Sequence, residues 1–294
     1  MQITLTGASG FVGKRLVETL QSAGHSLHLL GRKPHRSIPS TAWDSSQAVP
    51  SEALAGADAV INLAGEPVAQ RWSSAAKARI RNSRIEGTRH LVDAIGRMSK
   101  KPAVLISASA VGYYGTRGDE ILTEASPPAN DFLAEICVEW EREALRAETF
   151  GVRVVLPRIG IVLGRGGALA KMLPAFKSGV GGTLGPGTQW MSWIHLDYLI
   201  GIMEFALKAP SAKGPLNGTA PNPVRNTEFT RQLAKAVHRW ALFPVPEFAL
   251  KLLFGEMSIA ILASQRALPA ATEKAGYVFR YPELHAALQA VLAN

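Results

Sequence analysis

Short apolar runs along the chain alternate with longer segments in which apolar residues recur every three or four positions. Runs of strand length cover residues 3–5, 27–30 and 59–63. Between the first two, helical spacing relates the apolar residues Phe11, Val12, Leu16, Val17 and Leu20. Strands that alternate with helices predict an α/β fold, here a Rossmann-type doubly wound parallel sheet with helices on both faces.

A glycine-rich turn connects the first strand to the first helix. Its glycines, Gly7, Gly10 and Gly13, have the spacing G-x-x-G-x-x-G, and Gly24 stands where a helix C-cap glycine is expected. Glycines allow the backbone to approach a pyrophosphate that lies at the N-terminus of a helix. The strand, turn, helix and second strand therefore predict a dinucleotide-binding unit.

The second strand is followed by a basic stretch, GRKPHR, at residues 31–36. A protein that uses NAD usually has an acidic residue at this point, where it binds the ribose hydroxyls. Arg32 and Lys33 stand there instead, and their charges suit a 2′-phosphate. The stretch therefore predicts NADP(H) as cofactor, and a solvated basic turn is the alternative interpretation.

The residue pattern changes in the second half of the chain. A further strand is predicted near 103–110, a helix over 131–150 and a single strand over 152–164, after which glycines and aromatic residues become frequent. We expect an NADP-binding Rossmann domain at 1–163, with later strands returning to its sheet. A smaller substrate-binding lobe is expected at 164–243, and a helical tail domain at 244–294.

Composition narrows the function. The formal charge is +9, from 32 Lys and Arg against 23 Asp and Glu, but no nucleic-acid-binding signature accompanies it. We therefore expect the cations to bind the anionic cofactor and a small-molecule substrate, which could itself be an anion. We expect no nucleic-acid partner. The basic helix near residues 71–90, with Lys77, Arg81 and Arg84 on one face, is interpreted mainly as a solvated surface.

Location and metal binding are judged from absences in the sequence. No apolar run approaches the roughly 20 residues that span a bilayer, and the N-terminus enters a strand at once, so no membrane partner and a cytoplasmic location are expected. One cysteine, Cys137, precludes an internal disulfide. The seven histidines lack paired-ligand spacing, and no metal site is predicted.

Several motifs together resemble a known superfamily. GASGFVG, DAVINLAG, LPRIGIVLG and WIHLDYL resemble the extended short-chain dehydrogenases/reductases, in their NAD-dependent epimerase/dehydratase branch. NLAGE, LGRGGALAKMLPAF and QWMSWIH are similar to the atypical subgroup of SDR39U1-like epimerase family proteins, which have a C-terminal tail of the DUF1731 type. Some members of that subgroup carry a cell-division label, and no substrate is implied.

The resemblance also implies positions for the cofactor. It puts the glycine turn around the pyrophosphate, Arg32 and Lys33 on the 2′-phosphate, and Asp44 near the adenine. The chain beyond the third strand would line the cofactor, Arg84 would reach in from the following helix, and Ser107 and Ile161 would approach the nicotinamide. The full set is Gly7, Ser9, Gly10, Phe11, Val12, Gly13, Arg32, Lys33, Asp44, Asn62, Leu63, Ala64, Gly65, Arg84, Ser107 and Ile161.

The resemblance fails at the catalytic helix. Typical relatives carry Tyr-x-x-x-Lys there, in which the tyrosine exchanges a proton and the lysine lowers its pKa and holds the ribose. Phe132 and Ile136 stand at these positions, and neither can transfer a proton. Substitute catalytic groups are Ser109, Tyr114 and His195, although Tyr114 also aligns with a structural tyrosine.

Two further explanations stay open. A substrate polarised by Arg158 or by a bound water would need no dedicated acid, and the chain would then be an NADP(H)-dependent oxidoreductase or epimerase-like enzyme. Alternatively, the protein is a catalytically weak NADP(H)-dependent sensor or scaffold. The label of some subgroup members would connect such a protein to cell division. Relatives often dimerise through helices that correspond to 74–96 and 131–149, but these carry many charges here, so both monomer and homodimer are considered.

Overall fold

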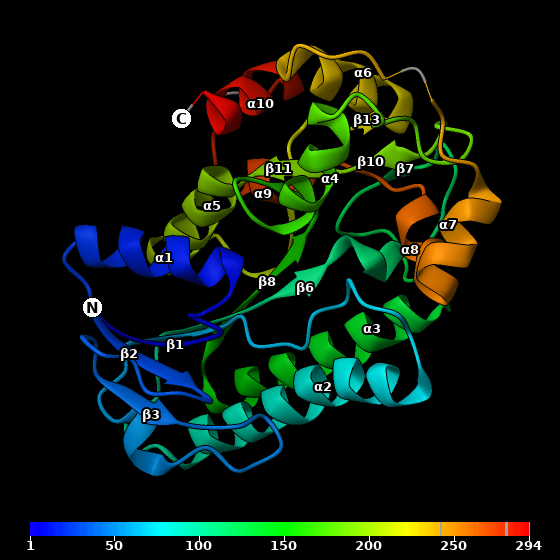
Figure 1. The fold of residues 1–294 in the computed structure, drawn as a ribbon. Coiled ribbons are helices and arrows are strands. Elements are labelled where there is room, and N and C mark those ends of the chain that lie inside the picture. The colour runs from blue at the N-terminus through cyan, green and yellow to red at the C-terminus, as the bar shows by residue number, and fades with distance from the viewer. Residues whose placement is uncertain (242, 280–281, 294) are drawn as a thin grey trace.

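A parallel sheet forms the centre of the computed structural model, which describes residues 1–241, 243–279 and 282–293 (Figure 1). The hydrogen-bonded order is β12-β8-β5-β4-β1-β2-β3, with β6 also paired to β8. All these pairings are parallel. The strands are β1 (Gln2–Thr6), β2 (Ser26–Gly31), β3 (Ser40–Ala42), β4 (Ala59–Asn62), β5 (Val104–Ser107), β6 (Ser109–Ala110), β8 (Arg153–Ile159) and β12 (Gly214–Gly218).

Helices cover both faces of this sheet. On one face α1 (Phe11–Ser22) and α5 (Leu196–Lys208) pack on apolar side chains of β1, β2 and β4 (Figure 1). On the other face α2 (Ser74–Arg97) and α3 (Phe132–Leu145) pack on apolar side chains of β2, β4, β5 and β8. The short helices η1 (Ser51–Leu54) and η3 (Arg146–Phe150) complete the second layer. The predicted doubly wound architecture is confirmed, and its strand order reverses between β1 and β4.

A smaller lobe lies beyond the carboxyl ends of the strands. It contains α4 (Gly167–Lys177), α6 (Asn226–Ala236) and two small sheets, which pair β9 (Ile161–Leu163) with β11 (Trp193–His195) and β10 (Trp190–Met191) with β13 (Val224–Arg225). Its core includes Leu163, Phe176, Trp193 and Phe229, and residues of the last helix also belong to it. Trp193 is fully buried there.

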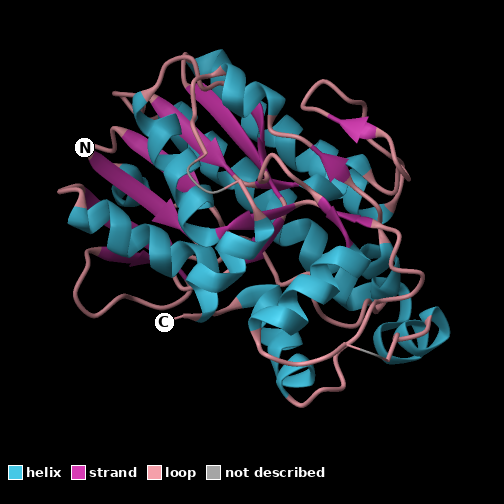
Figure 2. Cartoon of the chain, turned by 90° about the horizontal axis from the view of Figure 1, so that it is seen from above, coloured by secondary structure: helices cyan, strands magenta, loops and turns pink. Residues whose placement is uncertain are grey.

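The tail, coloured orange to red in Figure 1, consists of short helices at separate places around the lobe. Figure 2 shows the helices and strands of the chain from above. They are α7 (Glu247–Phe254), η4 (Gly255–Met257), α8 (Ser258–Leu262), α9 (Ala270–Lys274) and α10 (Leu284–Leu292). One tail strand, β14 (Arg266–Ala267), pairs with β7 (Ile121–Leu122), near the helical turn η2 (Val111–Tyr114). The tail therefore contacts both the sheet domain and the lobe. The proposed division at residues 163 and 243 stays a prediction.

The prediction of a single strand over residues 152–164 was wrong. The chain bends at Gly160, where a Cβ atom would lie 2.3 Å from the Ser192 carbonyl oxygen, so only glycine allows this approach. The segment therefore forms two strands: β8 stays in the main sheet and β9 turns into the lobe. The helix predicted over 131–150 ends at Leu145 and continues as η3.

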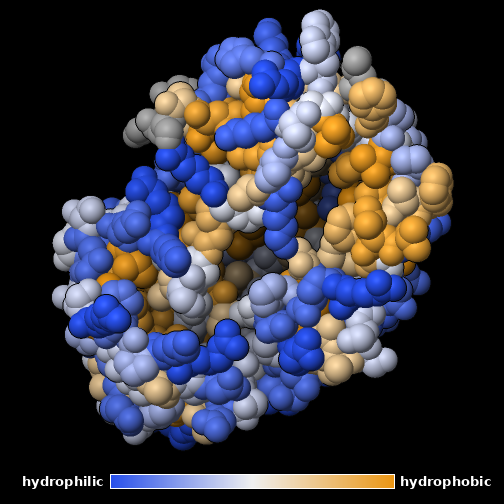
Figure 3. Space-filling view, viewed as in Figure 1, coloured by the Kyte–Doolittle hydropathy of each residue, from blue (hydrophilic) through white to orange (hydrophobic). Residues whose placement is uncertain are grey.

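The molecule is hollowed between the sheet domain and the lobe, on the face shown in Figure 3. Hydrophobic residues gather beside the hollow over α7 and α8, where Phe248, Leu252 and Ile259 are exposed (Figure 3). Within the described ranges, every helix is too short or too polar to cross a bilayer.

Candidate dinucleotide-binding site

The turn after β1 has the tight geometry that its glycines predicted. Gly7 has a φ of +74°, and a Cβ atom there would lie 2.6 Å from the carbonyl carbon of Leu63. A Cβ atom at Gly13 would lie 2.2 Å from the Gly7 carbonyl oxygen, which also accepts a 3.0 Å hydrogen bond from the Gly10 N–H. The turn is thus held against β4 and against the first turn of α1, and larger residues would displace it.

The N-terminus of α1 presents backbone N–H groups that no side chain caps within the described part of the chain. Gly10 is its N-cap residue, no side chain caps it, and its first turn contains no acidic residue. Ser9 and Gly10 are exposed and Phe11 and Val12 partly so. Uncapped N–H groups and the positive end of the helix dipole favour an anion at this point. This turn therefore fits a pyrophosphate.

A buried hydrogen-bond network fixes the chain at the end of β4. The Asn62 side chain accepts a 2.7 Å hydrogen bond from Thr6 Oγ1 and donates to Thr88 Oγ1 at 2.9 Å and to Ser107 Oγ at 3.2 Å. The backbone N–H groups of Leu63 and Ala64 both donate to Thr6 Oγ1. Because these side chains and two N–H groups are committed internally, the carbonyl groups of 63–65 and the Gly65 N–H are the backbone groups that remain for a ligand.

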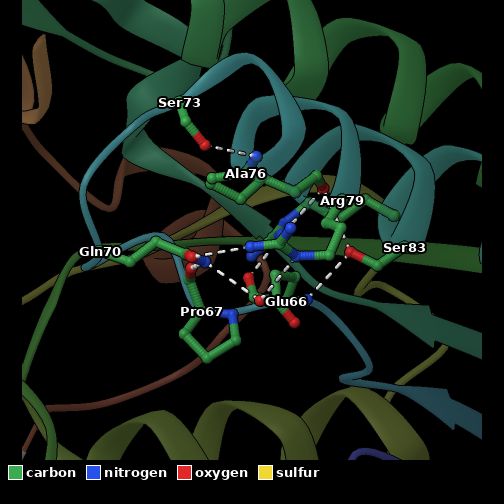
Figure 4. Close-up of polar contacts among 9 residues, drawn as sticks. Glu66, Pro67, Gln70, Ser73, Ala76, Arg79 and Ser83 are labelled. Carbon is green, nitrogen blue, oxygen red and sulfur yellow. Dashed lines mark hydrogen bonds and ion pairs between the residues drawn. The ribbon is translucent and has the colours of Figure 1, made fainter.

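The loop that follows Gly65 is attached to α2 by several polar contacts (Figure 4). The Glu66 N–H donates to Ser83 Oγ at 2.9 Å, and the Glu66 carboxylate accepts from Gln70 at 3.1 Å and lies 3.5 Å from Arg79. Ser73 caps α2 by accepting from the Ala76 N–H. The wall of the site beside Gly65 is therefore a fixed segment.

The cations at the end of β2 lie where a 2′-phosphate is expected. Arg32 and Lys33 are exposed, and within the described ranges neither side chain donates a hydrogen bond or forms an ion pair. Asp44, which follows β3, accepts hydrogen bonds from the N–H and hydroxyl of Ser46, and these bonds, with the nearby charge of Arg32, lower its pKa. The adenosine side of the site is consequently open and positive at its edge.

Two of the substitute catalytic groups lie in a buried polar cluster around Arg158. Glu141 accepts two 2.8 Å hydrogen bonds from the Arg158 guanidinium and one of 2.6 Å from Ser109 Oγ. The Tyr114 hydroxyl donates to Asn217 at 2.7 Å and accepts from Arg158 at 3.0 Å. Arg158 also lies 3.5 Å from the centre of the Tyr113 ring. This geometry favours structural roles for Tyr114 and Arg158.

Burial raises the pKa of Tyr114 to about 12, even though Arg158 acts in the opposite direction. A phenol with this pKa and no exposed surface is poorly suited to exchange protons with a substrate. Arg158 is itself only 2% exposed, which disfavours the alternative in which it polarises a substrate.

His195 lies at the other side of the site, at the end of β11. Its Nδ1 accepts a 3.1 Å hydrogen bond from the Asp197 N–H and so caps α5. Burial lowers its pKa. Asp197 in turn pairs with Arg15 of α1 at 2.8 Å. No hydrogen bond joins His195 to Ser109 or Tyr114 among the described residues, so the three candidates do not form one catalytic group.

The positions of the missing dyad are covered by apolar contacts. Ile136 belongs to a buried cluster with Trp72, Ile80 and Met257, and Phe132 packs against this cluster and lies 5.1 Å from Trp72, edge to face. Met257 comes from the tail, so the tail covers the face of α3 where the dyad residues would project. Proton transfer from these two positions is excluded by residue type; Lys77 of α2 lies over the Phe132 ring, 5.1 Å from its centre.

Sequence reasoning missed Glu141, the anion of the buried cluster. Its helical position, on the same face of α3 as Cys137, gave no sign that it pairs with Arg158, because the two lie on different elements. The cations of α2 are also less solvated than expected: Lys77 pairs with Glu256 of the tail, Arg81 pairs with Glu139 of α3, and Arg84 lies against Gly65.

The fold and this site define a Rossmann-type dinucleotide-binding protein, and comparison with known proteins gives its family. The profile of the NAD dependent epimerase/dehydratase family matches residues 3–217, and a domain of unknown function, DUF1731, matches residues 245–291. The chain belongs to the NAD dependent epimerase/dehydratase family, as its motifs predicted.

Relatives along the whole chain belong to the SDR39U1-like group. The epimerase family protein SDR39U1 homolog, chloroplastic, of Arabidopsis thaliana is 44% identical, over 99% of this chain and 87% of its own. YfhF of Bacillus subtilis, an epimerase family protein, is 39% identical over 100% of this chain and 99% of its own. The crystal structure of human SDR39U1 (isoform 2) with NADPH superposes with a TM-score of 0.93, at 34% identity, and both chains are covered completely.

Proposed function

We propose that this protein binds NADP(H) across the carboxyl edge of its sheet and acts as an oxidoreductase or epimerase-like enzyme on a small molecule held in the adjoining hollow. The observation that carries the proposal is the combination of a helix N-terminus without a side-chain cap after β1 and two exposed cations after β2. The first suits a pyrophosphate and the second a 2′-phosphate. The NADPH named for the human SDR39U1 structure supports the same cofactor.

The chain's own residues have distinct tasks in this proposal. The turn at 7–13 binds the pyrophosphate, Arg32 and Lys33 bind the 2′-phosphate, and the backbone of 63–65 lines the nicotinamide half. Ser107 ends β5, which pairs with β4, and Ile161 begins β9, just beyond the end of β8. When bound, the cofactor would supply or accept a hydride, and the hollow would hold the substrate beside the nicotinamide.

Ser109 and His195 remain the candidates for proton exchange. Ser109 is buried and donates to Glu141, whereas His195 is partly buried and has a pKa below its ordinary value. His195 is therefore neutral at pH 7 and able to accept a proton through Nε2, since Nδ1 already accepts the Asp197 N–H. We place His195 ahead of Ser109 for this role.

A second function is favoured by the apolar cover over Phe132 and Ile136. A protein whose helix α3 lacks the Tyr-x-x-x-Lys dyad, with the tail covering the dyad positions, would suit an NADP(H)-dependent sensor or scaffold. If the protein binds the cofactor tightly but turns over no carbonyl or nucleotide-sugar substrate, the second function is supported over the first.

The cofactor is tested by calorimetric titration of the cofactor-stripped protein with NADPH and NADH. We expect clear selectivity for NADPH, and Arg32→Glu should weaken NADPH far more than NADH because it replaces attraction to the 2′-phosphate by repulsion. Lys213→Glu is the matched control: it makes the same charge change just before β12, at the opposite edge of the parallel sheet. If Arg32→Glu weakens NADPH and NADH equally, Arg32 does not select NADPH over NADH.

A further inference from the structure

Helix α7 is apolar on nearly every side, yet little of it is buried. Six of its eight residues are apolar, and Leu250 is the buried one among them. Phe248, Leu252 and Leu253 are instead 73%, 76% and 65% exposed. A helix that is apolar all round normally lies in a core or against another apolar phase. The described part of this chain leaves α7 without such a cover.

Exposed apolar side chains extend this surface beyond α7. Trp240 and Phe243 lie in the segment between α6 and α7, and Ile259 lies on α8. The segment is joined to the lobe, because the Val245 N–H donates to the Thr183 carbonyl oxygen at 2.8 Å. Together with the exposed residues of α7 they form a set that we call the apolar ridge. Its members, each 59–79% exposed, are Trp240, Phe243, Phe248, Leu252, Leu253 and Ile259.

The base of the ridge is held against the sheet domain. Met257 and Ile261 pack into the apolar cluster beside α3, and Glu256 pairs with Lys77 of α2. Ile259 lies between Met257 and Ile261 in the chain but is exposed. The side of α8 that carries Ile259 is therefore presented outward from a fixed position, and the ridge is a built surface of the folded protein.

The ridge is large for an uncovered surface. A fully exposed aromatic side chain offers about 150–250 Å² for burial, so Trp240, Phe243 and Phe248 alone supply roughly 300–500 Å² at their exposures. The largest apolar patch on a soluble monomer is typically about 300–600 Å², and the three aliphatic members add to the aromatic area. Patches of this size mark contacts with another protein or with a membrane.

Cations border the ridge. Arg239 precedes Trp240 in the chain, and its Nε donates to the carbonyl oxygen of Lys177, at the end of α4, at 3.1 Å. Lys177 and Arg239 are exposed, and neither has a carboxylate partner among the described residues. Lys251 lies on α7 itself, where it pairs with Glu247. The edge of the apolar surface is consequently positive.

These charges favour an anionic lipid surface over a second copy of the chain. Since each chain has a formal charge of +9, two copies that met at the ridge would bring like charges together. An anionic leaflet attracts the same cations. Aromatic rings beside Lys and Arg also suit the bilayer interface, where the rings enter the apolar layer and the charged ends stay among the headgroups.

We propose that the apolar ridge inserts into one leaflet of an anionic lipid bilayer, with Lys177, Arg239 and Lys251 at the headgroups. Such an insertion reaches about 5–10 Å deep and needs no membrane-spanning helix. The sequence predicted no membrane partner because it has no spanning run, but the ridge is assembled from a connecting segment and two short helices. The ridge lies beside the hollow (Figure 3), so insertion brings the hollow close to the bilayer surface. The inference goes beyond the proposed function and does not depend on the cofactor.

Flotation with two kinds of vesicle tests the apolar part of the contact. Vesicles of phosphatidylcholine mixed with an equal amount of phosphatidylglycerol should carry the protein upward, and those of phosphatidylcholine alone should carry much less. Phe248→Gln combined with Leu252→Gln should weaken binding at least about tenfold, because burying one large apolar side chain is worth about that factor. Val278→Gln is the matched control: Val278 is 79% exposed but follows Tyr277, which packs on Phe205 of α5.

A charge reversal tests the cations. Lys177→Glu should weaken binding to the mixed vesicles and leave the residual binding to phosphatidylcholine unchanged. Lys213→Glu, the same change at the edge of the sheet, should have little effect. If Lys177→Glu and Lys213→Glu weaken binding equally, the overall charge of the protein rather than the ridge determines binding, and the proposal is wrong.

Other results would also overturn the proposal. One is that the unmodified protein floats with neither kind of vesicle, and another is that Val278→Gln loses as much binding as the double variant. If the unmodified protein is a dimer in sedimentation and the double variant a monomer, while no vesicle is bound, the ridge is an interface between copies. Circular dichroism checks that the double variant folds. If it does not, Ile259→Gln replaces it and has to lower binding to the mixed vesicles for the proposal to stand.

Discussion

Replacing Glu141 by glutamine tests the buried ion pair that holds the β8 end of the site. The carboxylate accepts 2.8 Å hydrogen bonds from Nε and Nη2 of Arg158 and a 2.6 Å bond from Ser109. Glu141→Gln keeps the size of the side chain but removes the charge, and one of its two ends becomes an N–H donor. The Arg158 guanidinium, 2% exposed, then lacks its anion.

The size of the effect follows from this burial. Removing one partner of a buried pair costs about 3–5 kcal/mol, because the remaining charge stays desolvated. The Coulomb energy of two charges about 4 Å apart at an effective dielectric constant of about 20 is about 4 kcal/mol, which agrees with that range. At about 2–4 °C per kcal/mol for a chain of this size, the Tm should fall by at least about 6 °C.

Urea denaturation followed by circular dichroism measures the free energy of unfolding directly. Glu228→Gln is the control, since Glu228 and Arg231 form an ion pair on the surface of α6, with side chains 35% and 68% exposed. That substitution should cost less than about 1 kcal/mol. If Glu141→Gln costs no more than this control, the buried pair does not stabilise the fold as argued here.

Two further changes address the turn and a titrating group. Gly13→Ala should weaken the binding of both NADPH and NADH in calorimetry, because its Cβ atom would meet the Gly7 carbonyl oxygen at 2.2 Å. Gly24→Ala is the control: no atom lies within 4 Å of the added Cβ, and both affinities should stay unchanged. Unaltered binding in Gly13→Ala would show that the turn can move without loss of affinity. His195 has a pKa below its ordinary value of 6.5 because of burial, so the unfolded chain binds its proton more readily and stability rises with pH through the window that ends near 6.5. His195→Gln should remove this part of the slope, at most about 1.4 kcal/mol per pH unit, in denaturation measured from pH 5 to 7.5, and identical slopes in both proteins would refute the shift.

The local pattern of the chain was enough to predict the architecture and to name candidate residues for the cofactor site. Apolar runs of strand length, helical spacing and the glycine turn are short-range signals, because each depends on residues within about one element. For the same reason the absence of Tyr-x-x-x-Lys could be read directly at Phe132 and Ile136. The break at Gly160 was missed because the contact that requires it, with Ser192, comes from a distant part of the chain.

Tertiary structure alone decided how the polar residues are used. Arg158 and Tyr114 were candidates for chemistry in the sequence, but burial next to Glu141 and Asn217 turns them into a closed network. Arg84 was one of three cations on a helical face, and only packing against Gly65 and Trp140 distinguishes it from the others. A sequence states which charges exist, but desolvation and partner distance fix what each charge does, and both depend on residues brought together from separate elements.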